Sequence, residues 1–170
     1  MNKNCETLCA PAERLPVADI QTEHDRIKSH PCSEYFNFFP LPVLVLDSRR
    51  QIVFANKAFT DIAGTGELLP FLAKRPGEAM GCVYSDAGPG GCGTSRYCRE
   101  CGALRAIMQN MENREHAQRE CQLLCRDETG STVARDLMVS VSPWETPEGT
   151  FYVLTLRDIG DEKRRQALER

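Results

Sequence analysis

The fold is decided by the stretch Leu41-Pro-Val-Leu-Val-Leu-Asp-Ser-Arg-Arg-Gln-Ile-Val-Phe-Ala-Asn-Lys-Ala-Phe59. It contains two short runs of apolar and β-branched residues, 41–47 and 51–55, which are typical of strands. A polar turn at residues 48–50 separates the runs, so together they predict a β-hairpin. Asn56 is a residue type that caps helix N-termini, and it predicts a short helix directly after the second strand.

Three further strands are expected in the second half of the chain, at residues 120–125, 132–141 and 151–156. The segments between them contain Asp, Gly and Pro, which are the residues of tight hairpin turns. With the first hairpin they give a five-stranded antiparallel sheet. The amphipathic stretches of the sequence supply helices for one face of this sheet, so the predicted fold class is α+β, with flanking helices at both ends.

The N-terminal flanking helix is predicted from a narrow apolar seam that follows Pro16. The seam consists of Val17, Ile20, His24 and Ile27. Two turns of such a seam cannot support an isolated helix, so we expect it to pack on the domain or on a second subunit. We expect a homodimer through the flanking helices, and we interpret His24 as a packing residue rather than a metal ligand.

Four cysteines lie within twenty residues of one another in a glycine-rich stretch: Cys82, Cys92, Cys98 and Cys101. Thiolates are the ligands of zinc and of iron–sulfur clusters, and four of them complete either kind of site. Structural zinc sites commonly use two short Cys pairs, whereas here only Cys98 and Cys101 form one, so the spacing favours a cluster. Zinc, a thiol–disulfide switch and a Cys98/Cys101 dithiol enzyme remain alternatives.

An amphipathic helix is predicted to begin near Cys101, because apolar residues recur at the helical spacing from Leu104 to Met111. Its first N–H groups would face the negative charge of a four-thiolate site. Three arginines close to the cysteines could offset the same charge, namely Arg96, Arg99 and Arg105. Of the other cysteines, Cys121 and Cys125 are expected to pack as small hydrophobes, and no role is assigned to Cys5 and Cys9.

Composition limits the class of protein. The net charge of −3 argues against nucleic acid as a partner, since a phosphate-binding face usually needs a basic excess. The sequence has no apolar run of membrane-spanning length and no apolar core of a signal peptide, so a cytoplasmic protein without a membrane partner is expected. In that compartment thiols stay reduced, and nine cysteines indicate ligands or redox groups before disulfides.

The hairpin, together with Val153-Leu-Thr-Leu-Arg-Asp-Ile-Gly160 and Glu162-Lys-Arg-Arg165, resembles a PAS domain. The resemblance implies a PAS sensor domain at residues 34–158, preceded by an N-terminal arm and helix at 1–33. It also implies an outgoing signalling helix at 159–170, with Asp158 at the junction that passes the signal on.

The cysteine-rich loop, residues 82–101, is similar to the sensor region of certain bacterial PAS histidine kinases. This likeness implies a two-component system, with a histidine kinase or another signalling protein as partner. The chain contains no kinase ATP-binding motif, so it is expected to be a sensor module rather than an enzyme. The leading hypothesis is a sensor of redox or oxygen state with a metal group on the four cysteines, and the alternative is a PAS dimerisation module with structural zinc.

Overall fold

The computed structural model describes residues 7–127 and 129–169. Its helices are α1 (Val17–Ser29), α2 (Cys32–Phe36), α3 (Lys57–Ile62), α4 (Pro76–Ala79), α5 (Gly102–Asn113) and α6 (Gly160–Leu168). Its strands are β1 (Val43–Leu46), β2 (Ile52–Ala55), β3 (Ala117–Arg126), β4 (Thr132–Thr146) and β5 (Gly149–Asp158). Two short 3₁₀ helices, η1 (Leu69–Phe71) and η2 (Arg96–Glu100), lie in the middle of the chain.

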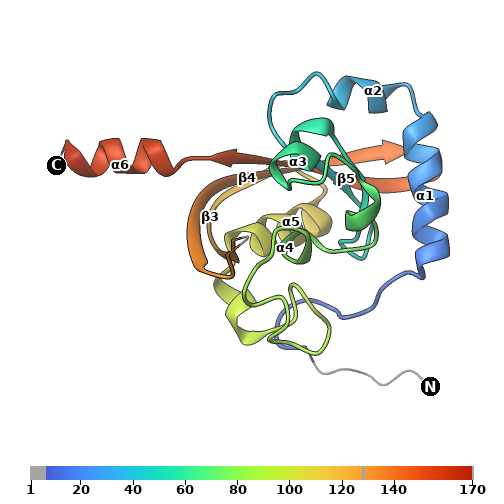
Figure 1. Ribbon diagram of the computed structural model, residues 1–170. Coiled ribbons are helices and arrows are strands. Elements are labelled where there is room, and N and C mark those ends of the chain that lie inside the picture. Colours follow the sequence, from blue (N-terminus) through green and yellow to red (C-terminus); the bar gives the residue numbers. More distant parts are fainter. Residues whose placement is uncertain (1–6, 128, 170) are drawn as a thin grey trace.

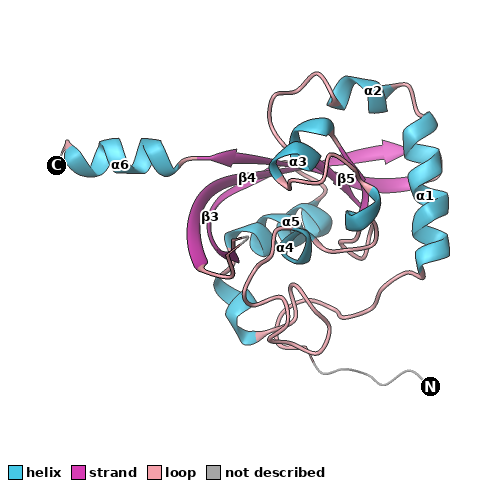
Figure 2. Cartoon of the chain, in the orientation of Figure 1, coloured by secondary structure: helices cyan, strands magenta, loops and turns pink. Residues whose placement is uncertain are grey.

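The five strands form one antiparallel sheet in the order β2-β1-β5-β4-β3 (Figure 2). The predicted hairpin is present, with Val45 opposite Phe54, and β5 inserts between β1 and β4. The α+β prediction is therefore confirmed. The three C-terminal strands are longer than the sequence pattern indicated, and β4 continues through Pro143, which lies opposite Tyr152.

Successive residues of the short strands β1 and β2 point to opposite faces of the sheet, and both faces are covered. Leu44, Leu46 and Ile52 lie in a core cluster with residues of α3 and α5 on one face. Val45 and Val53 lie in a second cluster with residues of α1 on the other. This explains why all the residues of β1 and β2 are buried and why the runs are continuously apolar rather than alternating.

Helix α1 packs on the sheet of its own domain. Ile20 and Ile27 are at most 2% exposed and contact the cluster around Val53 and Phe54. The ring nitrogen Nδ1 of His24 lies 2.8 Å from the carbonyl oxygen of Val53, so this histidine is a packing residue as predicted. The two isoleucines thus pack on the domain, which is one of the two partners expected for the seam, and they are not exposed to a second subunit.

Asn56 ties the hairpin to the helices around it and is fully buried. Its side-chain oxygen accepts hydrogen bonds from the backbone N–H of Val43 at 2.9 Å and of Phe59 at 3.1 Å, so it caps α3 as predicted. Its amide nitrogen donates to the carbonyls of Phe36 and Leu41, both at 2.9 Å. One side chain therefore fixes α2, β1 and α3 relative to one another.

The C-terminal helix α6 follows β5 directly and extends away from the rest of the fold (Figure 1). The Oδ1 atom of Asp158 accepts the predicted hydrogen bond from the backbone N–H of Gly160, the first residue of α6, at 2.8 Å, while Ile159 is the N-cap residue. Lys163 of α6 reaches back to Glu120 of β3 and Asp136 of β4, at 2.8 and 3.0 Å. Strands β3 and β4 thus hold the first turn of α6.

The stability of the packed α1 is predicted to fall as the pH rises toward neutral. Glu23 of α1 has a buried oxygen without a hydrogen-bond partner among the described residues, and burial followed by the nearby Asp47 raises its pKa to about 7. Because this folded-state pKa lies above the unfolded value, the folded protein binds the extra proton. The contribution of this protonation to the free energy of unfolding is complete below the pKa of Glu23 in the unfolded state. It is lost as the pH rises through the pKa of Glu23 in the folded state.

Replacing Glu23 by Gln should remove this pH dependence and stabilise the protein above about pH 7. Urea unfolding midpoints measured between about pH 5 and pH 8 test it, with the exposed Asp25→Asn substitution on the same helix as a control. Equal pH profiles for wild type and Glu23→Gln would contradict the assignment.

Candidate functional site

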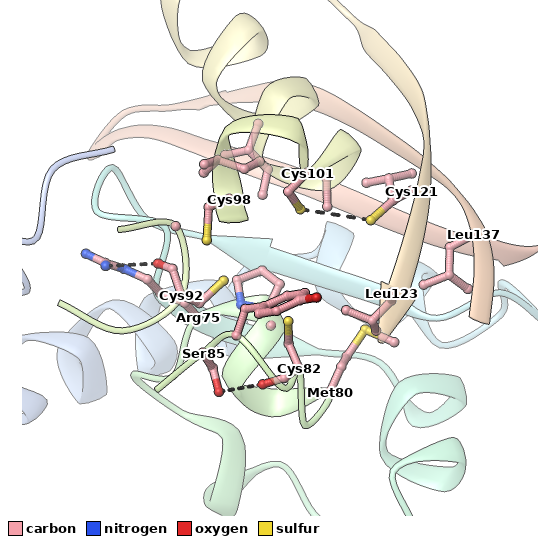
Figure 3. Close-up of a pocket in the computed structure, with 18 of the residues that line it drawn as sticks. Arg75, Met80, Cys82, Ser85, Cys92, Cys98, Cys101, Cys121, Leu123 and Leu137 are labelled. Atoms are coloured by element: carbon pink, nitrogen blue, oxygen red, sulfur yellow. Dashed lines mark hydrogen bonds between the residues drawn. The ribbon is translucent and has the colours of Figure 1, made fainter. Parts of the chain in front are cut away.

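A cavity of about 280 Å³ lies between the loop that follows α4, the start of α5 and the inner face of the sheet. All four predicted cysteines line it, and Cys121 of β3 lines it as a fifth. Figure 3 shows their side chains gathered around one space, with Leu123 and Leu137 of the sheet on its far side. A single water molecule needs only about 10–15 Å³ measured in this way, so the space suits a larger bound group.

Each of the four loop cysteines is positioned by local backbone contacts. The N–H of Cys82 donates to the carbonyl of Gly77 at 2.8 Å, and the N–H of Cys92 donates to Oε1 of Glu78 at 3.0 Å. Cys98 lies in η2, and its sulfur is 3.3 Å from the hydroxyl oxygen of Ser95. Cys101 is the residue from which α5 begins. The predicted set is therefore assembled from one turn after α4, one loop and one helix start.

Two glycines allow these segments to approach so closely. A Cβ atom on Gly77 would lie 2.7 Å from the sulfur of Cys92, so a side chain there would displace that cysteine. A Cβ atom on Gly102 would lie 1.8 Å from the carbonyl oxygen of Glu120, so only glycine lets the start of α5 rest on β3. Neither glycine was among those that the sequence pattern singled out.

Backbone N–H groups face three of the sulfur atoms. The N–H groups of Tyr84 and Ser85 face the sulfur of Cys82, and the N–H of Gly77 faces that of Cys92. The N–H groups of Ala103 and Leu104 face the sulfur of Cys101. Burial nevertheless raises the pKa of Cys82, and raises that of Cys92 to about 12. The hydrogen bond with Cys121 lowers the pKa of Cys101 and raises that of Cys121. A bound cation would deprotonate such thiols, and the N–H groups would then stabilise the thiolates.

Within residues 7–127 and 129–169, no three His, Cys, Asp or Glu side chains converge closely enough to bind one metal ion. The four cysteines thus surround a space rather than a single point. The only described histidine beyond the hairpin, His116, lies away from this space: its Nδ1 atom is 3.0 Å from the hydroxyl of Ser142 on the surface.

Comparisons with known proteins bear on the fold. No family model and no curated protein matches the sequence. Among solved structures, an RNA-binding light-oxygen-voltage receptor matches at a TM-score of 0.55 and 18% identity. That match covers 81% of this chain and 35% of the receptor, so the chain spans about a third of its length.

The PAS domain of nitrogen regulation protein NR(II) from Vibrio parahaemolyticus matches at a TM-score of 0.53 and 14% identity. The match covers 77% of this chain and the whole of that domain. A variant of the protein RsLOV matches at a TM-score of 0.51 and 13% identity, covering 82% of this chain and 68% of that one. The protein has a PAS fold. None of its described helices has the length and apolar character needed to cross a membrane.

Two buried arginines border the cavity of this PAS fold, Arg50 and Arg75. Arg75 is fully buried, and burial together with the positive charges of Arg50 and Arg14 lowers its pKa to about 10. Burial also lowers the pKa of Arg50, against the opposing effect of the Cys92 thiolate. Both remain cationic at neutral pH, so the cavity has a positively charged wall.

The arginines that the sequence suggested for this role lie elsewhere. Arg96, Arg99 and Arg105 are exposed, and Arg105 pairs with Glu100 at 3.3 Å on the surface. The positive charge beside the cavity therefore comes from Arg50 and Arg75, which precede the cysteine loop, rather than from the arginines next to Cys98 and Cys101.

Residues 8–15, which we call the N-terminal strap, cross the cysteine loop. The N–H of Ala10 donates to the carbonyl of Gly93 at 2.9 Å, and the thiol of Cys9 donates to the carbonyl of Ser95 at 3.1 Å. Arg75 donates to the carbonyls of Pro11, Ala12 and Glu13 in the strap and of Gly90 and Cys92 in the loop. Cys9, to which the sequence analysis assigned no role, therefore contacts the cysteine loop, while Cys5 lies outside the described residues.

Cys121 lines the cavity, which the sequence analysis did not predict. It is buried in the main core, as expected of a small hydrophobe, and its sulfur also lies 3.9 Å from that of Cys101 (Figure 3). The alternation of residues 121, 123 and 125 on one face of the strand was the available signal. Cys125 does behave as expected: it is buried in the main core, and it does not line the cavity.

Replacing Arg75 by Gln is predicted to loosen the strap and to lower the free energy of unfolding by about 3 kcal/mol. The reason is that the buried carbonyls around the guanidinium would lose their donors. Urea unfolding measures the loss, and the rate of tryptic cleavage after Arg14 in the strap should rise in parallel. The exposed Arg49→Gln substitution is the matched control, and an unchanged cleavage rate in Arg75→Gln would refute the role of Arg75.

Proposed function

We propose that this chain is a sensor module of the PAS type that binds an iron–sulfur cluster through Cys82, Cys92, Cys98 and Cys101. The cluster would report redox or oxygen state, and the signal would leave the domain through Asp158 and α6 to a histidine kinase or another signalling protein. The observation that carries the proposal is the gathering of the four cysteines around one cavity. When bound, such a cluster supplies one-electron chemistry and reactivity toward oxygen.

The spacing of the cysteines supports a cluster over a single ion. Zinc holds four sulfurs at about 2.3 Å each and needs them to converge on one point. A cluster has several iron atoms, so its thiolates stand around a larger volume. Four cysteines that line a cavity of about 280 Å³, without converging among the described residues, match the second arrangement better.

The charges around the cavity also support an anionic group. Four thiolates on a zinc ion or on an oxidised four-iron cluster leave a net charge of about −2. Arg50 and Arg75 lie in the wall with their charge buried, and all the described hydrogen-bond acceptors of the Arg75 guanidinium are backbone carbonyls rather than carboxylates. The two guanidinium groups would therefore balance a doubly negative group, and backbone N–H groups would solvate its sulfurs.

The remaining parts of the proposal follow from the position of the segments. Residues 34–158 would form the sensor, 159–170 the output helix and 1–33 the N-terminal arm, although the strap and α1 pack on the sensor itself. We propose no catalytic activity for the module. A homodimer would have to use the apolar side chains left exposed near α1 and α2, such as Val17, Tyr35 and Phe38.

Anaerobic purification followed by metal analysis and a visible spectrum tests the proposal. A brown protein with iron and sulfide is expected. A colourless protein with one zinc ion would support the alternative, a PAS binding module with a structural zinc site. Metal-free protein after anaerobic expression with iron would contradict both.

The four cysteines are predicted to act as a unit. Replacing any one of Cys82, Cys92, Cys98 or Cys101 by Ser should remove most of the bound metal, because a site with three ligands is open and labile. The matched control is Cys125→Ser, which changes a buried cysteine outside the cavity. Full retention of metal in Cys82→Ser and Cys92→Ser would exclude the four-ligand assignment.

The order of α6 is predicted to depend on the bound group. Removing the metal should change amide hydrogen exchange in residues 158–169 as well as in the loop 82–101. Asp158→Ala should keep the metal but flatten the C-terminal response, since the loss of the capping contact costs about 0.5–2 kcal/mol locally. If wild-type exchange in α6 is identical with and without metal, the site is structural and the sensing role is excluded.

A further inference from the structure

The thiols of Cys101 and Cys121 are in contact inside the cavity. Their sulfur atoms are 3.9 Å apart, and Figure 3 shows the two side chains directed at one another. A disulfide needs an S–S distance of about 2.05 Å, so the gap to be closed is about 2 Å. Small rotations of two side chains cover such a distance when the backbones beneath them are already adjacent.

The backbones are adjacent because α5 begins against β3. A Cβ atom on Gly102 would lie 3.2 Å from the Cα atom of Cys121, so the residue after Cys101 touches the chain at Cys121. Cys121 is held in the ladder opposite Leu137, and the carbonyl of Cys101 accepts the N–H of Arg105 at 3.0 Å. Both cysteines thus stand on regular structure, which keeps the sulfur atoms together.

The other cysteines near the pair have different partners. The sulfur of Cys98 is 3.3 Å from the hydroxyl of Ser95, so the Cys98/Cys101 dithiol suggested by the sequence is not the pair in contact. The thiol of Cys125 is directed at the carbonyl of Val133 at 3.6 Å. Geometry therefore selects Cys121 as the partner of Cys101.

We propose that Cys101 and Cys121 form a redox-active dithiol that a peroxide oxidises to a disulfide when the cavity holds no metal group. One thiolate attacks a peroxide oxygen, which breaks the O–O bond and gives a sulfenic acid. The second thiol displaces its hydroxyl group and forms the S–S bond. In sum, two thiols and one hydrogen peroxide give one disulfide and two water molecules.

This proposal goes beyond the metal site and does not depend on the identity of the bound group. Where Cys101 is a ligand, as proposed above, the disulfide and the metal group exclude one another. Cys121 is also the direct neighbour of Glu120, whose carboxylate binds Lys163 of α6 at 2.8 Å. The dithiol therefore lies one residue from a contact that holds the output helix.

The test uses the full-length chain, stripped of metal with a chelator and reductant under anaerobic conditions and verified by metal analysis. It is treated with hydrogen peroxide, alkylated, and digested with trypsin without reduction. Cleavage after Arg99 separates Cys98 from Cys101, whereas Cys121 and Cys125 stay on one peptide, residues 120–126. Mass spectrometry of wild type and Cys125→Ser then identifies the bonded pair.

The expected product links residues 100–105 to residues 120–126 in more than half of the protein, in wild type and in Cys125→Ser alike. Dithiothreitol should reverse it, and Cys121→Ala should abolish it. Fragmentation of the linked wild-type peptide distinguishes Cys121 from Cys125, so the wild-type protein tests the proposal even where a core substitution impairs folding. Cys101 found alkylated, or linked to Cys92, Cys98 or Cys125, in protein with native circular dichroism would overturn the proposal. Neither result bears on whether the freshly purified protein contains iron, so the two proposals fail separately.

Discussion

The buried guanidinium of Arg75 is the constraint on which the cavity depends. A buried charge is costly unless hydrogen bonds satisfy it, and all of its acceptors in the described chain are backbone carbonyls from three segments. These are the hairpin turn at Arg49, the loop at Gly90 and Cys92, and the N-terminal strap. Any rearrangement that moves one segment leaves part of the charge unsatisfied. The loop can therefore be irregular and glycine-rich and still hold its cysteines in place.

The sheet could be predicted because its signals are local. The hairpin needs only two apolar runs and a polar turn, and Asn56 needs only its own amide to connect the helices. The full length of β4 could not be predicted, because the expected strand ended at residue 141, just before Pro143. In the fold, β3 pairs only as far as Val141, so Pro143 has β5 on one side and no β3 residue on the other. A proline is tolerated at such an edge because it lacks only a donor that the ladder does not use there.

The sequence indicated that the four cysteines belong together, and they do line one cavity. It did not indicate the positive charges beside them, because arginine is usually a surface residue. Arg50 and Arg75 become cavity residues only when the strap and loop close over them. Likewise, the alternation of side chains along β3 places Cys121 on the inner face of the sheet. The contact between Cys121 and Cys101 depends on a tertiary contact, the close packing of Gly102 against the carbonyl of Glu120.

The cavity touches both flanking segments, and the two connections differ in strength. On the N-terminal side the strap is held by partly buried hydrogen bonds. The side-chain amide of Gln51 accepts a hydrogen bond from the backbone N–H of Leu15, just before α1, and donates one to the carbonyl of Leu15. On the C-terminal side α6 is held by the cap of Asp158 and by the exposed ion pairs of Lys163, which contribute little in water. A small change in the position of β3 is enough to alter the contacts that hold α6, whereas the hydrogen bonds that hold the strap are harder to break. In the function proposed above, the weaker connection is the one that would transmit a signal, because elements of low local stability are those whose populations respond to small free-energy changes.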